Sequence, residues 1–90
     1  MDFEKEMDVI YNWLDDLLSE EEKKKMLSCD VENLYIYHFG LGTWIRNNIL
    51  TEKSELYKFY LRMGVTHKDD MSMDIIEGFY GYLLYKTPEL

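Results

Sequence analysis

Apolar side chains recur every three or four residues along most of the chain, and this period constrains the fold more than any other feature of the sequence. Residues three or four apart lie on one face of an α-helix. Near the N-terminus the repeat runs through Phe3, Met7, Ile10, Leu14 and Leu17, and the stripe is widened by Val9, Trp13 and Leu18. The pattern therefore predicts an amphipathic helix over about residues 3–18, with this stripe turned toward a core.

The segments that follow carry helical signals as well. Ser19 and Glu22 have the spacing of a capping box, so a short helix is predicted over residues 20–27. Two more helices are predicted over about 32–47 and within 52–63, the second ended by Gly64. A last helix is predicted over about 69–86, and its core side is formed by Met71, Ile75, Ile76, Phe79 and Leu83.

Signals for strands are missing. No Asn-Gly or Asp-Gly turn joins alternating segments, and the one proline, Pro88, lies beside the C-terminus. Because proline interrupts helices, a chain almost free of it suits them. We therefore expect a single all-α domain over residues 1–90, built as a compact bundle of four main helices and one short helix.

Length and composition bound the class of protein. Ninety residues with 47% hydrophobic side chains are enough for one thin core. The single cysteine, Cys29, excludes an intramolecular disulfide and fits a reducing compartment. The N-terminus is acidic from Asp2 on and lacks the pattern of a signal peptide, and no apolar run approaches the roughly 20 residues of a membrane span. We expect a soluble cytoplasmic protein with no membrane partner.

The charge of the chain is concentrated at its start. The net charge is −8, and residues 1–22, with nine acids and one base, account for all of it. Such a surface repels phosphates, so direct nucleic-acid binding is disfavoured, and it attracts a basic protein. The predicted partner-binding residues form an acidic ridge along this segment: Glu4, Asp8, Asp15, Asp16, Glu20, Glu21 and Glu22. An ordinary solvated face is the alternative interpretation.

Residues 38–48, HFGLGTWIRNN, contain two closely spaced glycines inside a predicted helix. Each interior glycine costs a helix about 1 kcal/mol, so it needs a reason. The stretch lacks the third glycine of a dinucleotide fingerprint and the lysine of a phosphate loop. We therefore expect Gly42, and likewise Gly78 and Gly81, to mark the close approach of two helices, with rings such as Trp44 lying over the exposed backbone.

His38 and Arg46 lie on one face of the same predicted helix, and two interpretations of them stay open. In one, they form an anion pocket for a small molecule or nucleotide, with Asn47 beside it. In the other, they are structural, and Arg46 pairs with Asp69 or Asp70. A bidentate arginine–carboxylate clamp would tie this helix to the start of the last one.

No motif indicates catalysis or metal binding. The chain has two histidines and one cysteine, and both H-E-x-x-H and C-x-x-C are absent. The DDMSMD stretch at residues 69–74 lacks the glycine and spaced carboxylates of a calcium loop. Nothing around Cys29 suggests an activated nucleophile. We expect no enzyme, no catalytic residue, no metal and no cofactor.

Two ordered blocks resemble a family of small bacterial proteins of unknown function. Residues 38–48 match a block of the form HFxLGxWIRNN, and residues 63–76 match a second block containing HxDDMSxxII. Lys68 stands where the family usually has proline, and Ile49 and Leu50 replace its tryptophan-containing continuation. The resemblance implies a small helical domain without a known activity. Such free-standing small proteins resemble immunity and phage accessory proteins more than metabolic enzymes.

These observations predict a non-enzymatic interaction protein that neutralises a basic partner by occluding its cleft. The partner would be a nuclease toxin, as in toxin immunity, or a nucleic-acid-handling defence protein, as for a phage inhibitor. One alternative is a small-molecule or nucleotide binder that uses His38 and Arg46. Another is a homodimer joined through a face containing Gly78 and Gly81.

Overall fold

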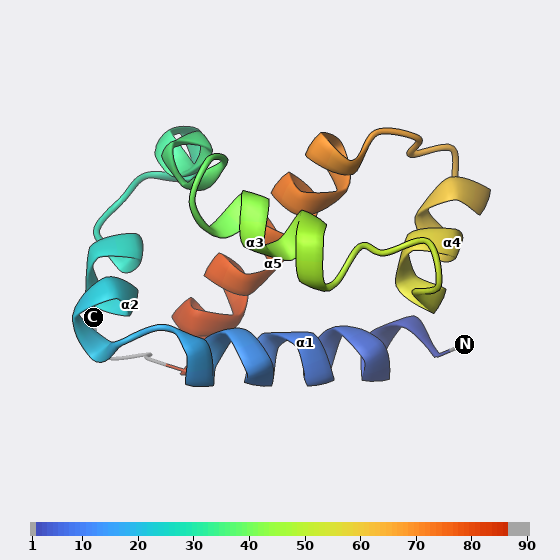
Figure 1. Ribbon diagram of the computed structural model, residues 1–90. Helices are drawn as coiled ribbons and strands as arrows, with labels where there is room; N and C mark the ends of the chain where they lie inside the picture. Colours follow the sequence, from blue (N-terminus) through green and yellow to red (C-terminus); the bar gives the residue numbers. More distant parts are fainter. Residues whose placement is uncertain (1, 87–90) are drawn as a thin grey trace.

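The computed structural model describes residues 2–86, and within that range it contains helices and no strand (Figure 1). In chain order the elements are α1 (Phe3–Leu17), α2 (Glu20–Leu27), the 3₁₀-helix η1 (Val31–Tyr37), α3 (Leu41–Asn48), α4 (Glu55–Arg62) and α5 (Lys68–Lys86). The all-α prediction is confirmed. The predicted count of four main helices and one short one is wrong, because only α1 and α5 are long and the other three α-helices have eight residues each.

The helix predicted over residues 32–47 is two elements rather than one. It breaks after η1, and Gly40 precedes α3 with φ −88° and ψ −86°, outside the helical region. Glycine adopts such angles at low cost, so this residue allows the chain to change direction. In Figure 1, η1 is seen nearly end-on at the upper left, whereas α3 lies across the centre of the molecule.

The other helix ends follow local sequence signals. In the capping box of α2, the Glu22 N–H donates to Ser19 Oγ (3.1 Å) and the Ser19 N–H donates to Glu22 Oε1 (3.0 Å), as predicted. Ser54 caps α4 by accepting from the Tyr57 N–H at 3.2 Å. Gly64 follows α4 with φ +90°, a left-handed conformation that favours glycine.

The core is organised around α5, on which α1, α2, η1 and α3 all pack. All five residues predicted for its core side are buried, which confirms that prediction. In Figure 1, α5 runs behind α3, with α1 along one side of the molecule and α4 at the end where the chain begins. No helix within residues 2–86 is long and apolar enough to cross a membrane.

The stripe on α1 is only partly buried. Met7, Ile10 and Leu14 lie in the core, but Val9, Trp13 and Leu17 do not. Their exposed fractions are 46%, 55% and 47%, so the prediction that they belong to the core face is wrong. The physical reason is that α1 packs on one side only, and its apolar stripe is wider than the surface available to cover it.

Candidate functional site

The Arg46 guanidinium lies in a ring of acceptors that join three parts of the chain. Its Nη1 donates to Ser72 Oγ on α5 (2.9 Å) and lies 3.4 Å from His38 Nδ1. Its Nη2 donates to the His38 carbonyl oxygen (3.1 Å) and to Thr43 Oγ1 (3.0 Å). The side chain of Arg46 is only 16% exposed. Arginine has five N–H donors, so these contacts use most of its hydrogen-bonding capacity inside the protein.

The predicted ion pair between Arg46 and Asp69 is present, but its geometry differs from the predicted clamp. Arg46 Nε lies 3.6 Å from one oxygen of Asp69, whose side chain is 68% exposed, so the bidentate clamp is absent. Asp70 is exposed and forms no ion pair within residues 2–86. The buried contact is instead made by Ser72, whose hydroxyl also donates to the Asp69 carbonyl oxygen at 2.9 Å.

Sequence reasoning missed Ser72. The available signal was its position, because it shares the helical face of the core residue Ile76, four positions further along. A small polar residue on a buried face needs a hydrogen-bond partner, and a buried arginine needs acceptors. Those two requirements together would have pointed to this contact.

The three residues of the predicted alternative pocket do not line one common space. Arg46 and Asn47 line an open hollow of about 560 Å³ together with Thr51, Glu52, Lys53 and Lys68. His38 does not line it. Asn47 is exposed, and the neighbouring Asn48 donates from Nδ2 to the Trp44 carbonyl oxygen at 2.9 Å, near the end of α3.

The three glycines expected at a close approach of helices behave differently. A Cβ on Gly42 would lie 3.0 Å from Arg46 Nη1 and 3.3 Å from the Tyr37 carbonyl oxygen, so a side chain at this buried position would press on both neighbours. A Cβ on Gly78 would run into the Tyr11 hydroxyl of α1. Gly81 is exposed and has nothing within 4 Å of such an atom, so its predicted close packing is wrong.

The surroundings of Gly78 and Gly81 also bear on the predicted alternative of a homodimer joined through these two residues. Because Tyr11 of the same chain covers Gly78, this residue and Gly81 do not form one bare face. Trp44, the ring expected over the glycine backbone, is half-buried against the core.

The seven acids of the predicted ridge fall into two groups. Three are engaged within the protein: Asp15 lies 2.6 Å from Lys23 and 2.8 Å from Lys86, Glu20 lies 2.8 Å from Lys23, and Glu22 caps α2. The other four are exposed and form no ion pair with any described residue: Glu4, Asp8, Asp16 and Glu21. The ridge is also interrupted, because α1 ends at Leu17 and the chain turns before α2 (Figure 1).

Asp15 links the end of α1 to α2 and α5 through ion pairs with Lys23 and Lys86. Hydrogen bonds from the Lys23 and Lys86 ammonium groups hold the pKa of Asp15 below its ordinary value. The same bonds raise the pKa of both lysines. Asp15 therefore stabilises the packing of α1, α2 and α5, and its charge is offset within the fold.

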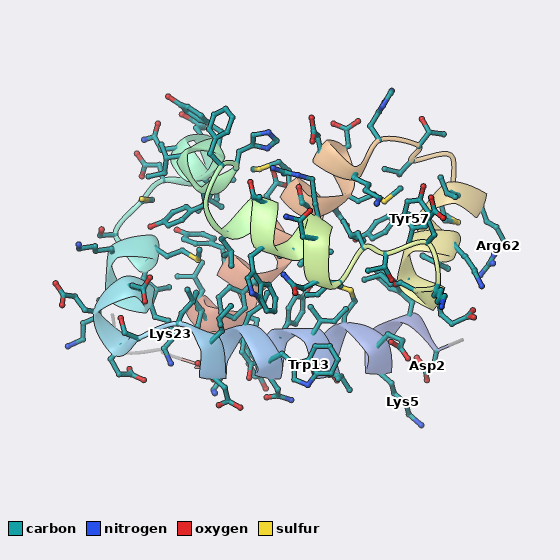
Figure 2. All side chains as sticks on the ribbon, in the orientation of Figure 1. Asp2, Lys5, Trp13, Lys23, Tyr57 and Arg62 are labelled. Carbon is teal, nitrogen blue, oxygen red and sulfur yellow. The ribbon has the colours of Figure 1, made fainter. Side chains whose placement is uncertain are left out.

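The exposed apolar residues of α1 form a surface that was not predicted, because the sequence pattern merges them with the buried stripe. We define the α1 face by five residues that share one side of the helix: Glu6, Val9, Trp13, Asp16 and Leu17. Figure 2 shows the Trp13 ring on the outside of α1. The signal in the sequence was the four-residue spacing of Val9, Trp13 and Leu17, which is a second stripe beside the buried one.

Two hollows border the α1 face. The larger, of about 550 Å³, lies between the end of α1, α2, η1 and α3, and its walls include Leu17, Leu18, Met26, Leu41 and Trp44. The smaller, of about 330 Å³, lies at the other end of the α1 face, and its walls include Glu6, Val9, Trp13 and Asn48. Both hollows therefore have walls from α1 and α3.

A second exposed apolar patch lies on η1 and the turn after it. It consists of Val31, Tyr35, Ile36 and Phe39, of which Phe39 is 84% exposed. Tyr35, at 65%, and Tyr85, at 85%, are the tyrosines that lie mostly in solvent. Among the described residues, no group of three or more histidine, cysteine, aspartate or glutamate side chains could hold a metal ion.

Comparison with known proteins identifies a family for this chain. A family model described as a domain of unknown function (DUF6794) matches residues 5–83. No curated protein and no solved structure matches the chain. The matched region runs from the first turn of α1 to near the end of α5, so it includes both the Arg46 cluster and the α1 face.

Proposed function

The chain belongs to the DUF6794 family, whose function is unknown, and from this premise we propose that it is a small non-enzymatic domain that binds and inhibits a basic protein. Its binding surface is the α1 face. The observation that carries the proposal is Trp13, a tryptophan 55% exposed on the segment that holds the whole net charge of the chain. Tryptophan is enriched among the residues that dominate interface energetics.

The charge around Trp13 supports a basic partner. Glu6 and Asp16 lie on the same side of α1 and form no ion pair within residues 2–86. Unpaired acids on a protein of net charge −8 speed encounter with a positively charged surface. Inhibition then follows by occlusion, because the domain would cover a cleft that otherwise takes nucleic-acid phosphates. A nuclease toxin and a nucleic-acid-handling defence protein are the two partner classes, and we place the encounter in the cytoplasm.

The test is affinity capture with the full chain and two charge-matched double variants. Glu6→Gln with Asp16→Asn removes two acids from the α1 face, and Glu4→Gln with Asp8→Asn removes two acids from another side of the same helix. We expect a basic protein to be retained at low salt, to be lost with the first variant and with Trp13→Ala, and to be kept with the second. Equal capture by both double variants contradicts the proposal, and Phe39→Ala controls for loss of any exposed aromatic.

A second candidate function is binding of a small anion or nucleotide in the hollow beside Arg46. It is favoured by three cations, Arg46, Lys53 and Lys68, which outnumber the one acid, Glu52, in the walls of this space of about 560 Å³. Since the Arg46 donors are largely used inside the protein, binding would depend on the two lysines. Thermal unfolding with and without nucleoside phosphates tests it, and the absence of any stabilisation removes this candidate.

A further inference from the structure

We infer that the partner binds through a basic amphipathic helix that lies along α1, over the two hollows that border the α1 face, which we together call the groove. This inference rests on the proposed function and adds the kind of segment that the partner presents. In such recognition, apolar residues on one side of a helix enter a hydrophobic groove at positions i, i+3 or i+4, and i+7.

The two hollows lie at opposite ends of the α1 face, with Leu17 in the wall of the larger and Val9 in the wall of the smaller. Opposite α1, the larger is walled by α2, η1 and α3, and the smaller by the end of α3, the turn after it and the start of α4. Val9 and Leu17 are eight positions apart on α1, which corresponds to about 12 Å along the helix axis. Residues i and i+7 of a partner helix are about 10.5 Å apart. The two spacings are similar, so one such pair can reach both hollows, and Trp13, in the wall of the smaller hollow, lies between Val9 and Leu17 along α1.

The chemistry of the walls defines the anchors and their flanks. The larger hollow is lined mainly by apolar side chains, and its volume of about 550 Å³ accepts a leucine, methionine or aromatic side chain. Three acids, Glu6, Glu22 and Glu55, also line the two hollows. They outnumber the two bases there, Lys25 and Lys53. Lysine or arginine beside the apolar anchors complements this excess of acid.

The same charges argue against other occupants. A second copy of this chain would bring its own acidic α1 to the groove, and like charges repel. An extended segment that binds by adding a strand would need the edge of a sheet to pair with, and residues 2–86 contain no strand. The regular four-residue spacing of Val9, Trp13 and Leu17 instead presents a ridge of the kind against which another helix packs.

The chain carries its own reporters for a binding experiment. Its only two tryptophans are Trp13 and Trp44, and each lines one of the hollows. The probe is a synthetic peptide of about 18 residues, long enough to form a helix, with leucines at i, i+4 and i+7 of each repeat and lysines elsewhere. One control peptide has the same composition with the leucines scattered around the helix, and a second has glutamate in place of lysine.

We expect the probe to change the tryptophan emission of the full chain with saturable binding. We also expect affinity at least about tenfold weaker for both control peptides, and for the Trp13→Ala and Leu17→Gln variants. Met63→Ala, which removes an exposed side chain outside both hollows, is expected to bind as the parent does. Equal affinity for the scattered peptide, or unchanged affinity in Leu17→Gln, overturns the inference. Circular dichroism confirms that each variant is folded.

Leu17→Gln also separates this inference from the proposed function. If capture of a basic protein survives Leu17→Gln but is lost when Glu6 and Asp16 are neutralised, the proposed function stands and the helix-in-groove inference is wrong. If no captured protein depends on those two acids, the proposed function fails and the inference fails with it.

Discussion

Arg46 and the α1 face are both charged regions of one small domain, but they differ in where their polar groups find partners. The Arg46 guanidinium is 16% exposed and bonds to Ser72, Thr43 and the His38 carbonyl oxygen. On the α1 face, Glu6 and Asp16 lie in solvent and form no ion pair within the described residues.

The difference separates polar groups that build the domain from those that remain available to a partner. A buried charge without hydrogen-bond partners is very costly, so the fold must supply partners for Arg46. An exposed carboxylate is already solvated by water and needs none. Sequence alone offers both Arg46 and the acids of the N-terminal helix as candidate sites, and only their contacts distinguish them.

The largest effect on stability is expected at Arg46. Arg46→Ala leaves Ser72 and the His38 carbonyl without their donor, so it should lower the free energy of unfolding by about 3 kcal/mol. Asp69→Asn should cost less than about 1 kcal/mol, because that carboxylate is mostly solvated. Urea unfolding of both variants measures this contrast. Similar losses for the two would mean that the ion pair, rather than the buried hydrogen bonds, holds the cluster together.

A smaller contrast is expected between two glycines. Gly42→Ala places a methyl group against Arg46 and the Tyr37 carbonyl oxygen, and should destabilise by about 1–2 kcal/mol. Gly81→Ala meets no neighbour within 4 Å, and because alanine favours helices, it should stabilise by about 0.5–1 kcal/mol. Thermal unfolding of the two variants shows whether each change stabilises or destabilises the protein. A stabilising Gly42→Ala would contradict the tight packing of the Arg46 cluster.

The same contrast exists within α1, because Asp15 is an acid of that helix that has ion-pair partners inside the fold, whereas Asp16 has none within residues 2–86. Its pKa is lowered in the folded state by Lys23 and Lys86. The resulting stabilisation is therefore present above its ordinary pKa of about 3.9 and is lost as pH falls through the lower folded value.

Asp15→Asn should lower the free energy of unfolding by up to about 1 kcal/mol at neutral pH, because solvent screens these pairs. At pH 3 the gap between variant and parent should narrow. Urea titrations at the two pH values measure it, and Asp16→Asn is the matched control without an internal partner. A gap of the same size at both pH values would argue against the role of these ion pairs.

The smallest effect on stability is expected on the α1 face. Trp13→Ala, and the double change Glu6→Gln with Asp16→Asn, should each alter the free energy of unfolding by less than about 0.5 kcal/mol. The physical reason is that these side chains lie mostly in solvent. Calorimetry checks this, and a large loss in either variant would show that the α1 face belongs to the fold rather than to an interface.

Local signals predicted much of this fold. The capping box of Ser19 and Glu22, the period of α1 and the buried side of α5 depend only on residues within a turn or two of each other. The break at Gly40 could not be predicted in the same way. The residues on both sides of it have helical patterns, and the change of direction depends on how η1 and α3 pack on α5.

The sequence by itself determined that the chain is all-α, where α1, α2 and α5 lie, and that its acids gather at the start. Tertiary structure alone decided which of those acids are paired, that Ser72 serves Arg46, and that Trp13 faces outward. The reason is that a helical period shows which residues share a face. Whether that face is covered depends on helices that are distant in sequence, and here α5 covers only part of α1.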